Sequence, residues 1–174
     1  VDVRDGALAV GAAVHLHVDA ERRHATMRHH TATHLLHAAL RQVVGKHATQ
    51  AGSAVNHERL RFDFQHHQAL TDSEKNMLEE VVTNAIIADL PVQIVETTLE
   101  DAQRAGAMML FDEKYGERVR MISIEGISCE LCGGTHVPRT GWLGAFQIVA
   151  ESAVAAGVRR LEAVCGVPAT RAMQ

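Results

Sequence analysis

Two pairs of metal-ligand residues lie far apart in the sequence, and together they constrain any fold that this chain can adopt. The first pair is His30 and His34, and the second is Cys132 and His136. Three imidazoles and one thiol are the usual ligands of zinc. A fold that uses all four residues must join distant parts of the chain around one point. The sequence therefore predicts a single Zn²⁺ site.

The local sequence around each pair supports this prediction. His30 and His34 lie where an apolar pattern of helical period begins, so their spacing places both rings on one helix face. The second pair encloses Gly133 and Gly134, which permit backbone angles that other residues resist and so suit a loop. The chain contains twelve histidines, so the spacing of both pairs carries the argument. We interpret His37 as a helix-surface residue.

The ligand count leaves the role of the metal open. Closed sites with four protein ligands are typical of structural zinc, whereas catalytic sites keep a position for water or substrate. Cys129 and Cys132 form a CxxC pair that, with His136, would make a local zinc knuckle lacking a fourth ligand nearby. A metalloprotease is disfavoured, because Thr31 stands where the HExxH motif has its glutamate.

Composition limits the compartment and the partners. The chain has 174 residues, enough for one domain or a domain with a small appendage. Its 17 Lys and Arg against 21 Asp and Glu give a charge of −4, so contact with RNA requires a local basic patch. Three cysteines favour a reducing compartment, and no apolar run reaches the length of a membrane helix. We expect a cytoplasmic protein.

Hydrophobic patterning predicts an α+β fold, with an antiparallel sheet packed against two main helices. The segment 1–26 is interpreted as strand-rich, with alternation over 12–19, and as the end of a small β-barrel; 27–174 is interpreted as the zinc-binding domain. The first helix is expected near 29–44, ended by Gly45. Thr71 and Glu74 form a capping box that begins the second helix.

The remaining elements follow from shorter patterns. We expect strands near 60–64, 92–97, 118–124, 144–151 and 158–165, a short helix near 98–105, loops at 47–53 and 129–140, and a buried segment at 108–111.

Four segments of the chain closely resemble the editing domain of alanyl-tRNA synthetase, in the same order and with the same spacing. They are MRHHTATHLLHAAL at 27–40, LRFDF at 60–64, ELCGGTH at 130–136 and AGVRRLEAV at 156–164. The related threonyl-tRNA synthetase domain differs at the CGGTH motif, whereas free-standing alanyl-tRNA trans-editing proteins share the core. The resemblance covers nearly the whole chain and implies that it is part of a longer synthetase.

The resemblance implies hydrolysis of the ester that joins serine or glycine to the tRNA for alanine. A pocket that accepts alanine cannot exclude the smaller glycine or strongly reject serine, so a second site must correct the error. The residues that match the family's metal ligands are His30, His34, Cys132 and His136.

Two further residues, Thr33 and Gln50, match the editing pocket of the family. We expect the Thr33 hydroxyl to hydrogen-bond a seryl side chain, and Gln50 to help place substrate or water. Zinc would lower the pKa of a water molecule or orient the aminoacyl group, and Cys132 would be required for catalysis.

For RNA contact, the candidates are Arg159, Arg160 and Arg61, although a single arginine more often lies on a solvated face or in an ion pair. The expected partners are the mischarged 3′ end of the tRNA for alanine and the remainder of the synthetase. The alternatives are a free-standing trans-editing deacylase and a noncatalytic zinc-stabilised RNA-binding module.

Overall fold

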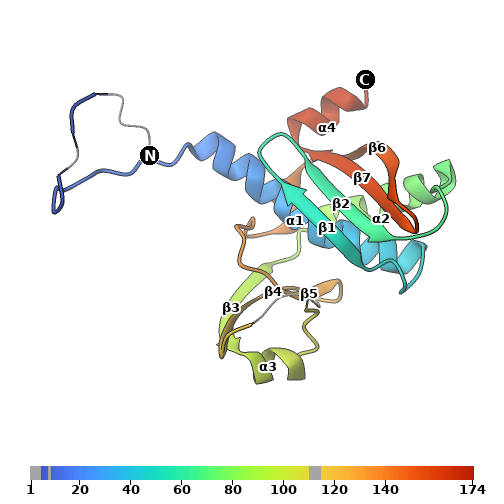
Figure 1. The fold of residues 1–174 in the computed structure, drawn as a ribbon. Coiled ribbons are helices and arrows are strands. Elements are labelled where there is room, and N and C mark those ends of the chain that lie inside the picture. Colours follow the sequence, from blue (N-terminus) through green and yellow to red (C-terminus); the bar gives the residue numbers. More distant parts are fainter. Residues whose placement is uncertain (1–4, 8, 110–114) are drawn as a thin grey trace.

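A computed structural model describes residues 5–7, 9–109 and 115–174 and shows an α+β architecture (Figure 1). The predicted fold class is confirmed. The helices are α1 (Ala20–Val43), α2 (Asp72–Ile87), α3 (Leu99–Arg104), α4 (Val167–Ala172) and the 3₁₀ helix η1 (Thr140–Leu143). The strands are β1 (Gln50–Val55), β2 (Leu60–Gln65), β3 (Val92–Thr98), β4 (Arg118–Ile124), β5 (Ser128–Leu131), β6 (Phe146–Ala155) and β7 (Val158–Cys165).

The strands form two antiparallel sheets rather than the single sheet that we expected. One sheet has the order β1-β2-β7-β6 and the other β3-β4-β5. The four-stranded sheet packs on α1 and α2, whereas the three-stranded sheet carries α3 and lies beyond α1 (Figure 1). Helix α1 thus lies between the two sheets and contacts both, through β2 and β7 on one side and β5 on the other.

The main core fills the space between the four-stranded sheet and the two long helices. Phe62 and Phe64 lie two positions apart on β2 and are fully buried, as the alternation of this segment predicts. Burying such a side chain contributes about 1.5–3 kcal/mol. This packing fixes α1, the helix that carries the first pair of predicted ligands. The core includes Leu35, Leu36 and Leu40 of α1, Leu78 and Val82 of α2, and Leu161 and Ala163 of β7.

Helix α2 begins as predicted. The Thr71 hydroxyl accepts a hydrogen bond from the Glu74 backbone N–H, and the Glu74 carboxylate accepts one from the Thr71 backbone N–H. A cap of this kind contributes about 1 kcal/mol. The predicted capping box is therefore confirmed.

Helix α1 begins at Ala20, about nine residues before the predicted start, so that prediction was wrong. Asp19 caps the helix by accepting a hydrogen bond from the Arg22 backbone N–H. The first turns are largely exposed and show no apolar stripe, because only later turns reach the core. The predicted end is confirmed: Gly45 has a φ of 130° and donates its N–H to the Leu40 carbonyl.

The strand predicted at 12–19 is wrong. This segment forms neither helix nor strand before Ala20, and Val14, Leu16 and Val18 are exposed. A strand is stabilised by hydrogen bonds to a neighbour, and none of the residues that the structure describes pairs with this segment. It extends away from the rest of the chain (Figure 1). The β-barrel and the boundary at residue 26 remain predictions.

Two predicted loops also contain strands. Residues 50–55 form β1 and residues 128–131 form β5, within or at the edge of the segments expected as loops. The small residues of β1 show no clear alternation, and pairing with β2, where Ser53 lies opposite Phe62, creates the strand.

The segment 108–111, which was expected to be buried, is exposed at Met109, whereas Leu110 and Phe111 lie outside the described residues.

Within the described ranges, no helix is long and apolar enough to cross a membrane.

Candidate metal centre

The fold brings the four predicted ligands together. Ligand atoms of His30, His34, Cys132 and His136 all lie within 4.8 Å of one another. The Cys132 Sγ is 3.3 Å from His30 Nε2 and 3.5 Å from His136 Nε2. Two donors of a tetrahedral zinc site lie about 3.3–3.8 Å apart, because each bond measures roughly 2.0–2.3 Å. The donor set and the two distances from Cys132 Sγ therefore fit one zinc ion.

A buried nitrogen of His34 that has no hydrogen-bond partner within the described structure also supports a metal ion at this site. The Nε2 of His34 is buried and has no hydrogen-bond partner among the residues described. A buried polar atom without a partner is costly and requires an explanation. The other ring nitrogen, Nδ1, lies 3.1 Å from Glu130 Oε2. With the proton on Nδ1, the Nε2 lone pair is available to a metal ion.

The ring of His136 is held in a similar way. Its Nδ1 lies 3.2 Å from the Thr31 hydroxyl oxygen, which also accepts a hydrogen bond from the Val137 backbone N–H. A proton on Nδ1 again leaves the Nε2 lone pair on the side of Cys132. Thr31 is fully buried, and sequence reasoning missed this contact because it joins residues on distant segments.

The electrostatics favour the metal-binding forms of two of the candidate ligands. Burial raises the pKa of the Cys132 thiol, but interactions with the imidazoles of His136, His30 and His34 outweigh this effect and lower the pKa to about 3. Burial lowers the pKa of His136 to about 4. Near neutral pH these residues are a thiolate and a neutral imidazole, the forms that bind metal ions.

His34 differs from these two ligands. Burial lowers the pKa of this imidazole, but the neighbouring Cys132 and Glu130 raise it to about 9. Near neutral pH, when no metal is bound, the ring therefore carries a second proton, on Nε2, in addition to the one on Nδ1. A metal ion must compete with this proton, so binding releases it to solvent.

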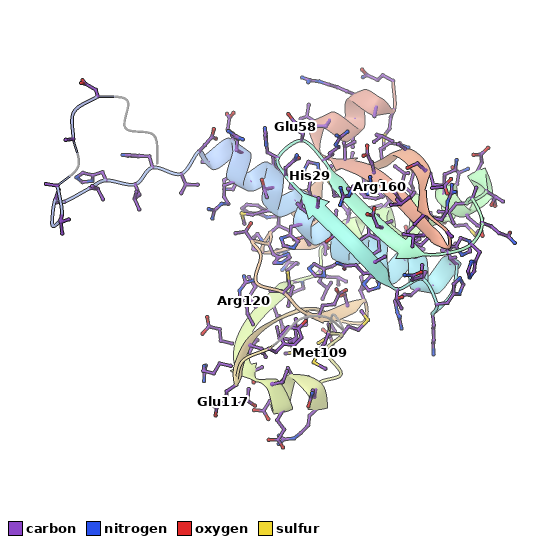
Figure 2. The ribbon with its side chains drawn as sticks, in the orientation of Figure 1. His29, Glu58, Met109, Glu117, Arg120 and Arg160 are labelled. Carbon is purple, nitrogen blue, oxygen red and sulfur yellow. The ribbon has the colours of Figure 1, made fainter. Side chains whose placement is uncertain are left out.

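The loop after β5 is shaped by Arg120 and Gly134. Arg120 lies on the three-stranded sheet (Figure 2), and its Nη1 donates hydrogen bonds to the carbonyls of Cys132 and Gly134. A Cβ at Gly134 would lie 1.7 Å from His30 Cε1, so only glycine fits beside this ring. The CGGTH motif pointed to Gly134, whereas no pattern in the sequence singled out Arg120.

Two predictions about nearby residues need correction. His37 is only 6% exposed and its Nδ1 lies 3.3 Å from Glu130 Oε1, so the surface assignment was wrong. The reason is that Glu130 of β5 packs on this face of α1. Cys129 lies opposite Ser123 in the sheet and is not among the four clustered residues, so the local zinc knuckle receives no support.

The two predicted pocket residues make local hydrogen bonds. The Thr33 hydroxyl is buried on α1 and donates to the His29 carbonyl at 2.8 Å. Gln50 is half-buried at the start of β1, and its Nε2 donates to the Ser53 hydroxyl at 3.2 Å. Thr33 thus shares the helix of the first ligand pair, whereas Gln50 belongs to the four-stranded sheet.

The three predicted RNA-binding arginines lie in ion pairs on the four-stranded sheet. Arg160 makes two hydrogen bonds to the Asp63 carboxylate, at 2.7 and 2.8 Å, and Arg61 Nε lies 3.7 Å from the same carboxylate. Hydrogen bonds from Arg160 lower the pKa of Asp63. Arg159 pairs with Glu151 at 2.6 Å. Figure 2 shows Arg160 well separated from Arg120 of the three-stranded sheet.

Comparisons with known proteins agree with the motifs. The family described as the threonyl and alanyl tRNA synthetase second additional domain matches residues 119–162. An alanine–tRNA ligase of Thermotoga maritima is 51% identical over 95% of this chain, and that of Paracidovorax citrulli is 53% identical over 99%. The chain spans only 19% and 18% of these two relatives. These similarities show that the chain corresponds to the editing-domain region of alanyl-tRNA synthetases.

Proposed function

We propose that this chain hydrolyses the ester that joins serine or glycine to the tRNA for alanine, as the editing part of an alanyl-tRNA synthetase. The observation that carries this proposal is the convergence of four zinc-type donors from α1 and the loop after β5. The similarity to alanine–tRNA ligases supports this choice of substrate. A synthetase that activates alanine requires a separate site to remove glycine, which is smaller, and serine, which only adds a hydroxyl.

The residues of the cluster would hold Zn²⁺, which supplies a Lewis acid or an anchor for the aminoacyl group. Thr33 would recognise the seryl side chain. Because the Thr33 hydroxyl hydrogen is directed to the His29 carbonyl, its oxygen would accept a hydrogen bond from the seryl hydroxyl. Gln50 would position the substrate or a water molecule, and Cys132 would be required for hydrolysis.

We also propose contact with tRNA through Arg159, Arg160 and Arg61. Their carboxylate partners hold the guanidinium groups in fixed positions. Phosphate groups of the tRNA would bind these guanidinium groups, either in place of the carboxylates or together with them. The remainder of the synthetase would supply further recognition of the tRNA. The reducing environment suggested by three unpaired cysteines supports a cytoplasmic location.

A second candidate is a noncatalytic RNA-binding module that zinc stabilises. Four protein donors gathered within 4.8 Å of one another are typical of a closed, structural site. A structural ion supplies folding free energy directly, so its removal unfolds the domain. A catalytic ion can be removed with loss of activity and little loss of structure.

The two candidates can be separated by one set of measurements. Seryl-, glycyl- and alanyl-tRNA for alanine are incubated with the chain, with and without a metal chelator, while circular dichroism monitors folding. We expect selective hydrolysis of the seryl and glycyl esters and its loss with chelator in a folded protein. Equal hydrolysis of all three esters would contradict proofreading. No hydrolysis, together with unfolding by the chelator, would favour the structural module.

A further inference from the structure

Glu130 joins two histidines of α1 to the strand that leads into the metal-binding loop. Its side chain is buried at the end of β5, with a residue exposure of 9%. Oε2 lies 3.1 Å from His34 Nδ1, whereas Oε1 lies 3.3 Å from His37 Nδ1 and accepts a hydrogen bond from the Ser128 hydroxyl at 2.8 Å. One oxygen is therefore held by two neighbours, and the other faces a metal-ligand candidate.

We infer that Glu130 is a positioning residue for the metal centre, which holds His34 with its Nε2 atom directed at the ion. This inference rests on the proposed metal site. The carboxylate accepts a hydrogen bond from the Nδ1 N–H and so leaves the lone pair on Nε2, a buried atom that, like Nε2 of His37, has no hydrogen-bond partner among the described residues. Its negative charge also makes the imidazole a stronger donor.

His37 and Ser128 serve as anchors for this carboxylate rather than as ligands. His37 lies outside the four-residue cluster and packs its ring against Phe62, with centroids 5.2 Å apart. Ser128 lies two positions before Glu130 on β5, so both side chains share one face of the strand. Together they fix the carboxylate before a metal ion arrives, which reduces the reorganisation that binding requires.

The alternative is that Glu130 only ties β5 to α1. A tie of this kind would affect the free energy of unfolding but not the affinity of a folded protein for metal. The inference is therefore tested by metal binding, measured as the Kd for Zn²⁺ by competition with a chromophoric chelator. The absorption spectrum of bound Co²⁺ adds a report on the ligand field of the ion.

The decisive variant is Glu130→Gln, which preserves the shape of the side chain and removes its charge. We expect its affinity for Zn²⁺ to fall by about 10–100-fold, with an altered Co²⁺ spectrum and retained fold. Ser128→Ala removes one anchor and should weaken binding less. Glu79→Gln is the matched control, because Glu79 is a half-buried carboxylate of α2 that accepts hydrogen bonds from Gln147 and Ile148. The affinity of Glu79→Gln for Zn²⁺ should equal that of the parent chain.

Parent-like affinity and spectrum in Glu130→Gln would overturn the inference. If this variant does not fold, Ser128→Ala decides, since unchanged affinity there would equally contradict the proposed role. Failure of the parent chain itself to bind Zn²⁺ or Co²⁺ would instead refute the metal site on which the inference depends. The two failures are therefore distinguishable.

Discussion

Gly134 and His30 lie so close that no side chain fits between them: a Cβ on Gly134 would be 1.7 Å from His30 Cε1. Gly134→Ala must displace either the ring or the loop that carries Cys132. We expect weaker Zn²⁺ binding, by at least about tenfold, since a displaced ligand loses the required geometry. The adjacent Gly133→Ala is the control, because a Cβ there meets no atom within 4 Å. Equal Kd values for the two variants would contradict this prediction.

Cys132→Ala tests the link between metal and hydrolysis. The variant loses the thiolate that lies within 3.3–3.5 Å of two imidazoles, so we expect loss of bound Zn²⁺ and of seryl-tRNA hydrolysis. Metal content and deacylation rate are measured on the same preparation. Cys129→Ala serves as the control, because Cys129 lies on β5 outside the cluster. Lost zinc with full activity in Cys132→Ala would show that the metal has no role in hydrolysis.

Thr33→Val tests recognition of the seryl hydroxyl. Valine preserves the volume of threonine but removes the oxygen that would accept the substrate's hydrogen bond. We expect kcat/KM for seryl-tRNA to fall by about tenfold or more, since a buried hydroxyl left without its hydrogen-bond partner costs roughly 1–3 kcal/mol. Glycyl-tRNA is the internal control, because it has no hydroxyl to recognise. A parallel loss for both substrates would argue against the proposed contact.

Arg160→Met tests the RNA contact separately from the ion pair. If Arg160 binds a phosphate, the variant should bind tRNA more weakly, and the dependence of log K on log salt should become shallower by about one unit. The change also leaves Asp63, which is 7% exposed, without its main partner. In the double variant Arg160→Met/Asp63→Asn, stability should recover while tRNA affinity should not. Recovery of both would assign Arg160 a purely structural role.

His29 predicts a pH dependence of stability. Its Nδ1 donates to the Asn56 carbonyl at 3.0 Å, and its Nε2 accepts the Cys165 backbone N–H at 3.1 Å, so the folded protein requires the neutral ring. Burial lowers the pKa of His29 below its ordinary value of 6.5. Below pH 6.5 the unfolded chain binds a proton that the folded chain does not bind, so the free energy of unfolding must fall as pH decreases.

His29→Gln is the variant that checks this prediction. It should lower the free energy of unfolding at pH 7.5 by about 1–3 kcal/mol, because buried partners lose their hydrogen bonds. Between pH 6.5 and 5, the free energy of unfolding of this variant should also depend less steeply on pH than that of the parent, as measured by urea denaturation of the metal-loaded protein. A variant with the same slope as the parent would show that another group is responsible.

Local patterns were sufficient where the signal lies within one element. The Thr71–Glu74 cap, the apolar stripe of α2 and the alternation of Phe62 and Phe64 each predicted an element that the structure contains. The early turns of α1 and the strand β1 were not predicted. The early turns of α1 are exposed, and β1 consists mostly of small residues, so neither segment has the hydrophobic periodicity that indicates a helix or a strand.

For the candidate site, the sequence by itself determined which residues are the candidate donors. The spacing of His30 with His34 and of Cys132 with His136 predicted the two pairs, because spacing within a helix or loop limits which side chains share a point. Only the tertiary structure decided that the two pairs meet and how their rings are held. Contacts such as Glu130 with His34 join residues on different elements, and their geometry depends on how α1 packs between the two sheets.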